Sequence, residues 1–150
     1  MTISPKQGEI LLSKDATPGL AYYLNNRPEK MVPSGGILRL KVKDEKKLYP
    51  EYLTLVLNSI VVQKQIERDA GGSIINHWLV DQVKNTFIPI LPFTKQKKIS
   101  ETVTESFCNR ELSRKLLDIA KSSVEMAIEK DEKTAEKWIA GEVNKLNVKI

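Results

Sequence analysis

The amino-acid sequence predicts an α+β fold, in which a small mixed sheet-and-helix domain, residues 1–93, precedes a long coiled-coil-forming helix, residues 94–150. The first observation is that all seven prolines and six of the seven glycines precede Phe93. The second is that apolar residues recur at three- and four-residue spacing between Ile99 and Leu146, which is typical of an amphipathic helix. Residues that break regular structure are therefore concentrated in the first part of the chain.

Two stretches of the first part have the composition of short strands. Residues 9–12 are mainly apolar and follow a turn-forming Lys-Gln-Gly segment. Residues 37–43, ILRLKVK, alternate apolar side chains with three basic ones, which is typical of a half-buried strand. Residues 14–36 lie between them, contain Pro-Gly, Asn-Asn and Gly-Gly pairs, and are predicted to form a loop. The polar face of the second strand is therefore expected to be basic.

The rest of the first part alternates helix and strand. A single helix is predicted from Pro50 to a stop near Gly71-Gly72, because apolar residues recur there at helical spacing and proline favours the first helical turn. A loop follows. Residues 80–85 are then expected to form a short helix and residues 86–91 a strand.

The second part is predicted to be helical from Thr94, its expected N-cap, to about Asn147. A helix of about fifty residues is about 75 Å long, which exceeds the diameter of a small domain. Asp131-Glu132, where the apolar stripe thins, is the expected place for any break. A stripe of this length needs a partner helix to cover it.

Composition limits the classes of protein to which the chain can belong. The net charge of +5 among 150 residues favours an anionic partner. Cys108 is the only cysteine, which excludes an internal disulfide and a Cys-rich zinc site and favours a reducing compartment. The sequence has no apolar run long enough to span a bilayer and no signal-peptide pattern at its start. We therefore expect a soluble cytoplasmic protein that does not enter a membrane.

Motifs of catalysis and cofactor binding are missing from the sequence. The glycine pairs are not followed by the Lys-Ser/Thr of a phosphate-binding loop, and no nucleophile elbow accompanies the single histidine, His77. His77 and Cys108 do not form a recognisable metal-ligand set. The sequence therefore predicts a protein without catalytic residues, cofactor or metal.

Two loops contain side chains suited to nucleic acid. NNRPEK, residues 25–30, and GGSIINHWL, residues 71–79, combine basic and amide side chains with glycines that permit close backbone approach. Trp78 has two interpretations, as a core residue or as a side chain that stacks on a base, and the core is the more frequent place for tryptophan. Together with the basic strand and with Arg68, near the end of the helix predicted from Pro50, these loops supply the candidate DNA-binding residues Arg27, Lys30, Arg39, Lys41, Arg68, Ser73, Asn76 and His77.

The order of these pieces resembles the target recognition domain of the specificity subunit of type I restriction-modification enzymes. Five segments occur in the family's order over nearly the whole chain: GEILLSKDATPG, SGGILRLKV, PEYLTLVLNS with QKQIER, GGSI, and IPILPFTKQKKI. The closing segment is the most specific, because members typically end the domain with Ile-Pro-hydrophobic-Pro-Pro before a helix that opens with Gln and basic residues. Its matching residues are Ile88, Pro89, Ile90, Leu91, Pro92, Gln96 and Ile99. Phe93 and Lys95 depart from the usual pattern without breaking it.

The resemblance implies a DNA reader that does no chemistry itself. In such subunits the recognition domain reads half of a split sequence in double-stranded DNA. Methyl transfer and cleavage belong to separate modification (methyltransferase) and restriction subunits, which the specificity subunit positions on the DNA. The prolines at 89 and 92 are expected to fix the direction in which the helix leaves the domain. The alternative is a truncated scaffold that contributes only the coiled-coil helix and does not read DNA.

The resemblance also implies that the long helix pairs with a second one. A full specificity subunit has two recognition domains and two long helices in an antiparallel pair, whereas this chain has one of each. Its domain is also expected to lack an N-terminal part, and a natural half-subunit, a truncated gene product and an expressed fragment all fit. We therefore expect a homodimer through the helix. Its expected interface residues are Leu112, Leu116, Ile119, Val124, Ala127, Trp138 and Ile139.

Overall fold

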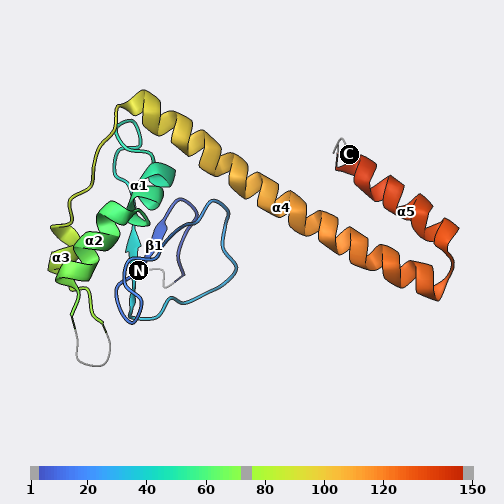
Figure 1. The fold of residues 1–150 in the computed structure, drawn as a ribbon, viewed down its shortest axis with the longest axis horizontal. Coiled ribbons are helices and arrows are strands. Elements are labelled where there is room, and N and C mark those ends of the chain that lie inside the picture. Colours follow the sequence, from blue (N-terminus) through green and yellow to red (C-terminus); the bar gives the residue numbers. More distant parts are fainter. Residues whose placement is uncertain (1–3, 72–75, 147–150) are drawn as a thin grey trace. The chain divides into compact units, whose positions relative to one another are not determined.

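The computed structural model describes residues 4–71 and 76–146. The chain forms two compact units, Met1–Thr104 and Glu105–Ile150. The first unit contains the sheet and the short helices, and the second is helical (Figure 1). The α+β class is confirmed, and helix α4, Phe93–Glu129, is the expected long helix.

A three-stranded antiparallel sheet forms the centre of the first unit. Its strands are β1, Ile10–Ser13, β2, Ala21–Tyr23, and β3, Ile37–Leu40, in the order β2-β1-β3. β1 and β3 confirm the two predicted strands, but β3 ends at Leu40, so Lys41 and Lys43 of the predicted stretch 37–43 lie beyond the strand. β2 lies in the region that was predicted to be loop, and that prediction was wrong.

The core lies between one face of this sheet and the helices. Side chains alternate between the two faces of a strand, so Ile10 and Leu12 of β1 point to the same face, and both are completely buried. They pack in one cluster with Tyr52 and Val56 of α1, Pro50–Leu57, and with Trp78. Trp78 is therefore a core residue, which confirms the more frequent of its two interpretations.

The predicted helix from Pro50 to Gly71-Gly72 is interrupted, so its prediction as one helix was wrong. α1 ends at Leu57 and α2 spans Ile60–Asp69. Asn58 lies between the two helices, and its side chain bonds to the sheet. Its Nδ2 donates to the Ala21 carbonyl at 2.8 Å, and its Oδ1 accepts from the Ala21 N–H at 3.0 Å. These two bonds satisfy a backbone pair of β2 and fix the break beside it.

Residues 86–91 are not a strand, contrary to the prediction. Pro89 and Pro92 have no N–H to give to a sheet. The backbone of Phe87 bonds to the Gln65 amide, and the Tyr52 hydroxyl donates to the Pro89 carbonyl at 2.7 Å. Side chains thus do here what a neighbouring strand would do. The short helix expected nearby is α3, Val80–Lys84.

The first turns of α4 belong to the first unit and are held there by hydrogen bonds and ring stacking. Lys95 and Gln96 donate their N–H groups to the Pro92 carbonyl, so the helix begins at Phe93 and Thr94 is not its N-cap, which corrects that prediction. The buried Gln96 amide donates to the Leu91 carbonyl at 2.8 Å and accepts from the Tyr49 N–H at 3.3 Å. The rings of Tyr49 and Phe93 stack with centroids 4.7 Å apart.

The helical second part is not continuous. α4 ends at Glu129, and α5, Glu132–Lys145, follows a break at the expected place. Asp131 caps α5, because its Oδ1 accepts from the Thr134 N–H at 3.0 Å and its Oδ2 from the Thr134 hydroxyl at 2.7 Å. Within the second unit, the chain turns back so that α5 runs in the opposite sense to α4 (Figure 1). Among the described residues, no helix combines the length and the apolar composition needed to cross a membrane.

Candidate nucleic-acid interface

The positive charge of the chain belongs to the first unit. Residues 1–104 contain 15 Lys and Arg against 10 Asp and Glu, whereas residues 105–150 contain nine of each. The first unit therefore accounts for the whole net charge of +5. An anionic partner is attracted by the unit that contains the sheet.

The strand register brings basic residues from three loops to one end of the sheet. Ile10, at the start of β1, pairs with Tyr23 at the end of β2 and with Leu40 at the end of β3. The segment before β1 and the segments after β2 and β3 therefore leave the sheet at the same end. These segments contain Lys6, Arg27, Lys30, Lys41 and Lys43. We call these five residues the basic sheet end.

The cations of the basic sheet end are exposed and lack carboxylate partners. In residues 4–71 and 76–146, no ion pair within 4.0 Å involves any of the five. Because none of the five is ion-paired among the described residues, their charge is available to an external anion. Arg27, Lys30 and Lys41, three of the candidates from sequence, are thus gathered at one end of the sheet.

An open cavity of about 670 Å³ lies at this end of the sheet. Its described lining comes from two short segments, residues 4–7 and residues 27–30 without Glu29. Hydrogen bonds tie the segments together: the Gln7 side-chain amide donates to the Asn25 carbonyl at 2.9 Å, and the Gly8 N–H donates to the Leu24 carbonyl at 2.8 Å. The cavity therefore has walls that are fixed to β1 and β2.

At the opposite end of β1 the charges are compensated. His77 Nδ1 lies 2.9 Å from Asp15 Oδ1, and Lys14 Nζ lies 2.7 Å from Asp15 Oδ2. The Lys14 ammonium, with His77 as the second contributor, lowers the pKa of the Asp15 carboxyl. Asn76 is exposed, and its carbonyl accepts from the Ala16 N–H at 3.0 Å. His77 and Asn76 therefore lie away from the basic sheet end.

Arg39 is already engaged inside the protein. Its guanidinium makes a bidentate pair with Glu9, with Nε to Oε2 at 2.8 Å and Nη2 to Oε1 at 2.9 Å. The arginine lowers the pKa of Glu9, and the glutamate in turn raises the pKa of Arg39. Arg39 therefore ties β3 to the residue that precedes β1 and has less freedom than the five cations to meet a phosphate.

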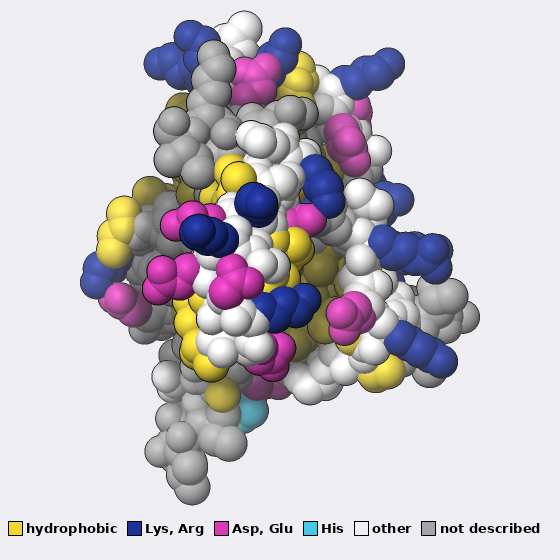
Figure 2. Space-filling view, turned by 90° about the vertical axis from the view of Figure 1, so that its right-hand side faces the viewer, with side chains coloured by type: hydrophobic (Ala, Val, Ile, Leu, Met, Phe, Trp, Pro, Cys, Tyr) yellow, Lys and Arg dark blue, Asp and Glu magenta, His cyan; other side chains and the backbone are white. Residues whose placement is uncertain are grey.

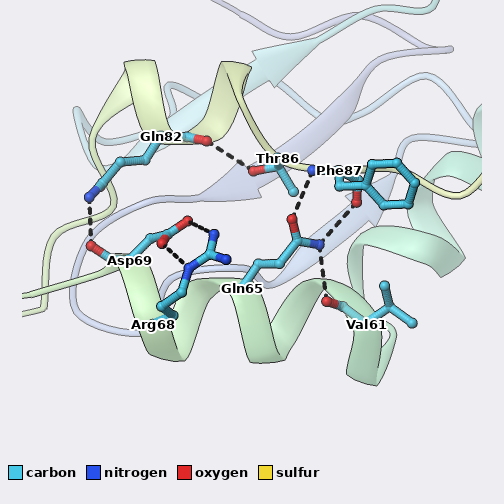
Figure 3. Close-up of polar contacts among 7 residues, drawn as sticks. All are labelled: Val61, Gln65, Arg68, Asp69, Gln82, Thr86 and Phe87. Atoms are coloured by element: carbon cyan, nitrogen blue, oxygen red, sulfur yellow. Dashed lines mark hydrogen bonds and ion pairs between the residues drawn. The ribbon is translucent and has the colours of Figure 1, made fainter.

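Arg68 is paired in the same way, with its neighbour Asp69. Its Nε and Nη2 donate to the two carboxylate oxygens of Asp69 at 2.6 and 2.9 Å (Figure 3). The Asp69 carbonyl accepts from Gln82 of α3, so this end of α2 is fixed to α3 (Figure 3). Ser73, another candidate, lies outside the described residues.

The helical unit has balanced surface charge. Residues 105–150 contain nine basic and nine acidic residues, and on the face of the molecule drawn in Figure 2 basic and acidic side chains are interspersed, with hydrophobic side chains between them. Several pairs have helical spacing, such as Glu111 with Lys115 and Glu142 with Lys145. Because the two counts are equal, residues 105–150 have no net positive charge to attract DNA.

Two apolar rows lie on α4. The expected interface residues Leu112, Leu116, Ile119 and Ala127 are half-buried, as are Trp138 and Ile139 of α5. Val124 is 61% exposed and belongs to another row with Leu117 at 56% and Ile128 at 80%. At 100° per residue the two rows are separated by roughly a third of a turn.

Lys6 was not among the candidates from sequence, although it lines the cavity with Arg27 and Lys30. Lys6 was missed because strand β2 was not predicted from the sequence. Only the antiparallel pairing of β1 with β2 shows that the residue before one strand lies beside the loop after the other. In the described part of the chain, no group of three His, Cys, Asp or Glu side chains is arranged to hold a metal ion.

Comparisons with known proteins identify relatives. The family model of the type I restriction modification DNA specificity domain matches residues 2–121. A solved structure of the S subunit of a type-I restriction-modification system from M. genitalium is similar, with a TM-score of 0.57 and 16% sequence identity. The similarity covers 85% of this chain and 31% of that one, so the chain spans about a third of the length of the S subunit. At this identity the likeness concerns the fold. None of the curated proteins matches the chain.

Proposed function

The chain belongs to the family of type I restriction modification DNA specificity domains, and from this membership we propose that its basic sheet end contacts double-stranded DNA. The family match covers the whole first unit except residue 1. The chain then acts as a sequence reader without catalytic residues of its own. Modification and restriction subunits, which it would position on the DNA, are its proposed protein partners.

The observation that carries this proposal is the contrast between the two ends of the sheet. Lys6, Arg27, Lys30, Lys41 and Lys43 come from three loops and have no carboxylate within ion-pair distance in the described residues. At the other end of β1, both Lys14 and His77 contact the Asp15 carboxylate. Duplex DNA attracts cations that are not already neutralised, since phosphate contacts release condensed counterions. The basic sheet end is therefore the proposed contact surface.

We place Arg39, Arg68 and His77 in a supporting role within the proposal. Each has a carboxylate partner, so a phosphate would have to compete with Glu9, Asp69 or Asp15. Arginine and histidine can still donate a second hydrogen bond, and base edges accept such bonds in the grooves. Their substitution is expected to change affinity less than that of the unpaired cations.

The second unit is proposed to pair with a second copy of the chain. Leu117, Val124 and Ile128 form an exposed apolar row, and a row of this kind favours burial against another helix. The equal numbers of acidic and basic residues in 105–150 remove net repulsion between two copies. An antiparallel pair about a twofold axis would present two recognition domains, which suits an inverted DNA repeat.

Selection from a pool of randomised duplexes tests the reading function. The chain is immobilised alone and with its modification subunit, and retained DNA is sequenced. A reader enriches one sequence motif, whereas a scaffold that contributes only its helix retains all sequences equally. A variant with Lys115→Ala and Lys121→Ala, which removes two exposed charges from the second unit, is the matched control and is expected to enrich the same motif.

A further inference from the structure

The cavity at the basic sheet end has the chemistry of an anion site. Three of its lining residues, Lys6, Arg27 and Lys30, are cations, and none of the described lining residues is acidic. Ser4 and Gln7 add a hydroxyl and an amide. The Ser4 hydroxyl oxygen accepts a long bond of 3.5 Å from the Met31 N–H, so its own O–H remains a donor.

Among the described residues, the cavity offers cationic groups but no aromatic surface to a ligand. Its apolar lining among described residues consists of Pro5 and Pro28, and no aromatic ring is there to stack on a base. Pockets for small organic molecules are mostly lined by hydrophobic and aromatic side chains. A charged group that presents several acceptor oxygens fits this lining better.

The walls of the cavity are organised before any ligand arrives. Pro5 and Pro28 restrict the backbone on both sides. The bond from Gln7 to the Asn25 carbonyl joins the two segments, and the Gly8 to Leu24 bond continues the pairing of β1 with β2. With the backbone of both segments held in place, binding has to order only the exposed basic side chains.

We propose that this cavity seats one backbone phosphate of the DNA, held jointly by Lys6, Arg27 and Lys30. The inference rests on the proposed function and adds that the cavity anchors the domain on DNA without reading the sequence. The cavity is open, so it admits a phosphate that remains part of a long polymer. Phosphate contacts position a protein but carry no sequence information, so the cavity anchors the domain equally on every duplex.

A double-mutant cycle tests whether the three cations share one phosphate. Affinity of the full chain is measured by fluorescence anisotropy on three duplexes of unrelated sequence, for Lys6→Ala, Arg27→Ala and the double variant. Groups that bind one phosphate are coupled, so the double variant is expected to lose several-fold less affinity than the product of the single losses. Lys41→Ala, at the same end but outside the cavity, supplies the control, because its loss multiplies with that of Lys6→Ala.

Each result has a distinct meaning. Coupling of Lys6 with Arg27, equal on all three duplexes, supports the shared phosphate. If the two losses multiply, or differ several-fold between duplexes, the cavity is not a common phosphate seat, while DNA binding by the wild type keeps the proposed function. If the wild type binds no duplex at low salt, both proposals fail. Titration with inorganic phosphate, followed at the Arg27 and Lys30 amides by NMR, then shows whether the site takes free phosphate instead. The substituted side chains are exposed and have no hydrogen-bonding side-chain partner among described residues, and thermal midpoints verify folding.

Discussion

The buried side-chain amide of Gln96 is one of the contacts that hold the start of α4 in the first unit, and Gln96→Ala is the substitution that tests its contribution. The Gln96 side chain is 1% exposed and bonds to the Leu91 carbonyl at 2.8 Å and to the Tyr49 N–H at 3.3 Å. Its third contact, to the Lys47 carbonyl at 3.5 Å, is at the limit of a hydrogen bond. The amide thus connects the segment before α1, the proline segment and the helix itself.

The magnitude follows from the two groups that lose their partner. An unsatisfied buried polar group costs about 1–3 kcal/mol. Leu91 is 38% exposed, so water reaches its carbonyl in part and this loss falls at the low end. We therefore expect Gln96→Ala to lower the free energy of unfolding of the first unit by about 2–3 kcal/mol, including the small cavity that it leaves.

Urea unfolding followed by tryptophan fluorescence measures this change. Trp78 is buried in the first unit and Trp138 lies in the second, so a Trp138→Phe background restricts the signal to the first. Lys97→Ala, an exposed change on the same helical turn, is the matched control and is expected to change stability by less than about 0.5 kcal/mol. A loss for Gln96→Ala as small as that of the control would refute the role of the amide.

Gln96→Glu distinguishes the lost donor from the lost volume. The carboxylate would face the Leu91 carbonyl in place of a donor, and burial disfavours the charged form, so the pKa of this glutamate would be raised. A raised pKa of an acid means that the protonated side chain is the better tolerated one. The stability deficit of Gln96→Glu should therefore shrink as the pH falls toward about 4, near the unfolded pKa. A deficit independent of pH would contradict the hydrogen-bond assignment.

Three further predictions concern other parts of the structure. Val124→Asp with Ile128→Asp is expected to shift sedimentation toward monomer, because both side chains lie on the exposed row; unchanged sedimentation of a dimeric wild type would move the interface elsewhere. Arg39 lowers the pKa of Glu9 below its ordinary 4.5. The ion pair therefore stabilises the folded protein above that pH, and this stabilisation is lost as the pH falls through the pKa of Glu9 in the folded state. Between pH 6 and 3, Glu9→Gln should thus lose less stability than the wild type, and parallel curves would contradict the pairing. Asn58→Ala should cost about 1–2 kcal/mol in urea unfolding, since it frees a backbone pair of β2, and a neutral effect would show that the two bonds are dispensable.

The regular elements that sequence could predict are those whose pattern is local. β1 is mainly apolar and follows a turn, β3 begins an alternating stretch, and the break before α5 coincides with Asp131, whose side chain caps the next helix. β2 has three residues and lies among turn-forming ones, so local composition did not distinguish it from loop. The break after α1 arises because Asn58 bonds to β2, which is a contact distant in sequence.

The candidate site shows the same limit. The loop of Arg27 and Lys30 has a composition suited to phosphate, and the structure places both residues on the cavity. Lys6 joins them only through strand pairing. Arg39, Arg68 and His77 have suitable side chains, but their carboxylate partners Glu9, Asp69 and Asp15 are revealed only by the folded geometry.

Amide chemical-shift mapping of the chain with a duplex tests the central claim, that the basic sheet end meets DNA. A titration is followed by NMR at low salt and repeated at higher salt, where the affinity should fall by about 0.9 log units per phosphate contact for each log unit of salt. We expect the largest changes on residues 4–7, 25–30 and 41–43, with small changes in residues 105–146. Changes concentrated on α5 or on the residues around Asp15, with the basic sheet end unaffected, would contradict it.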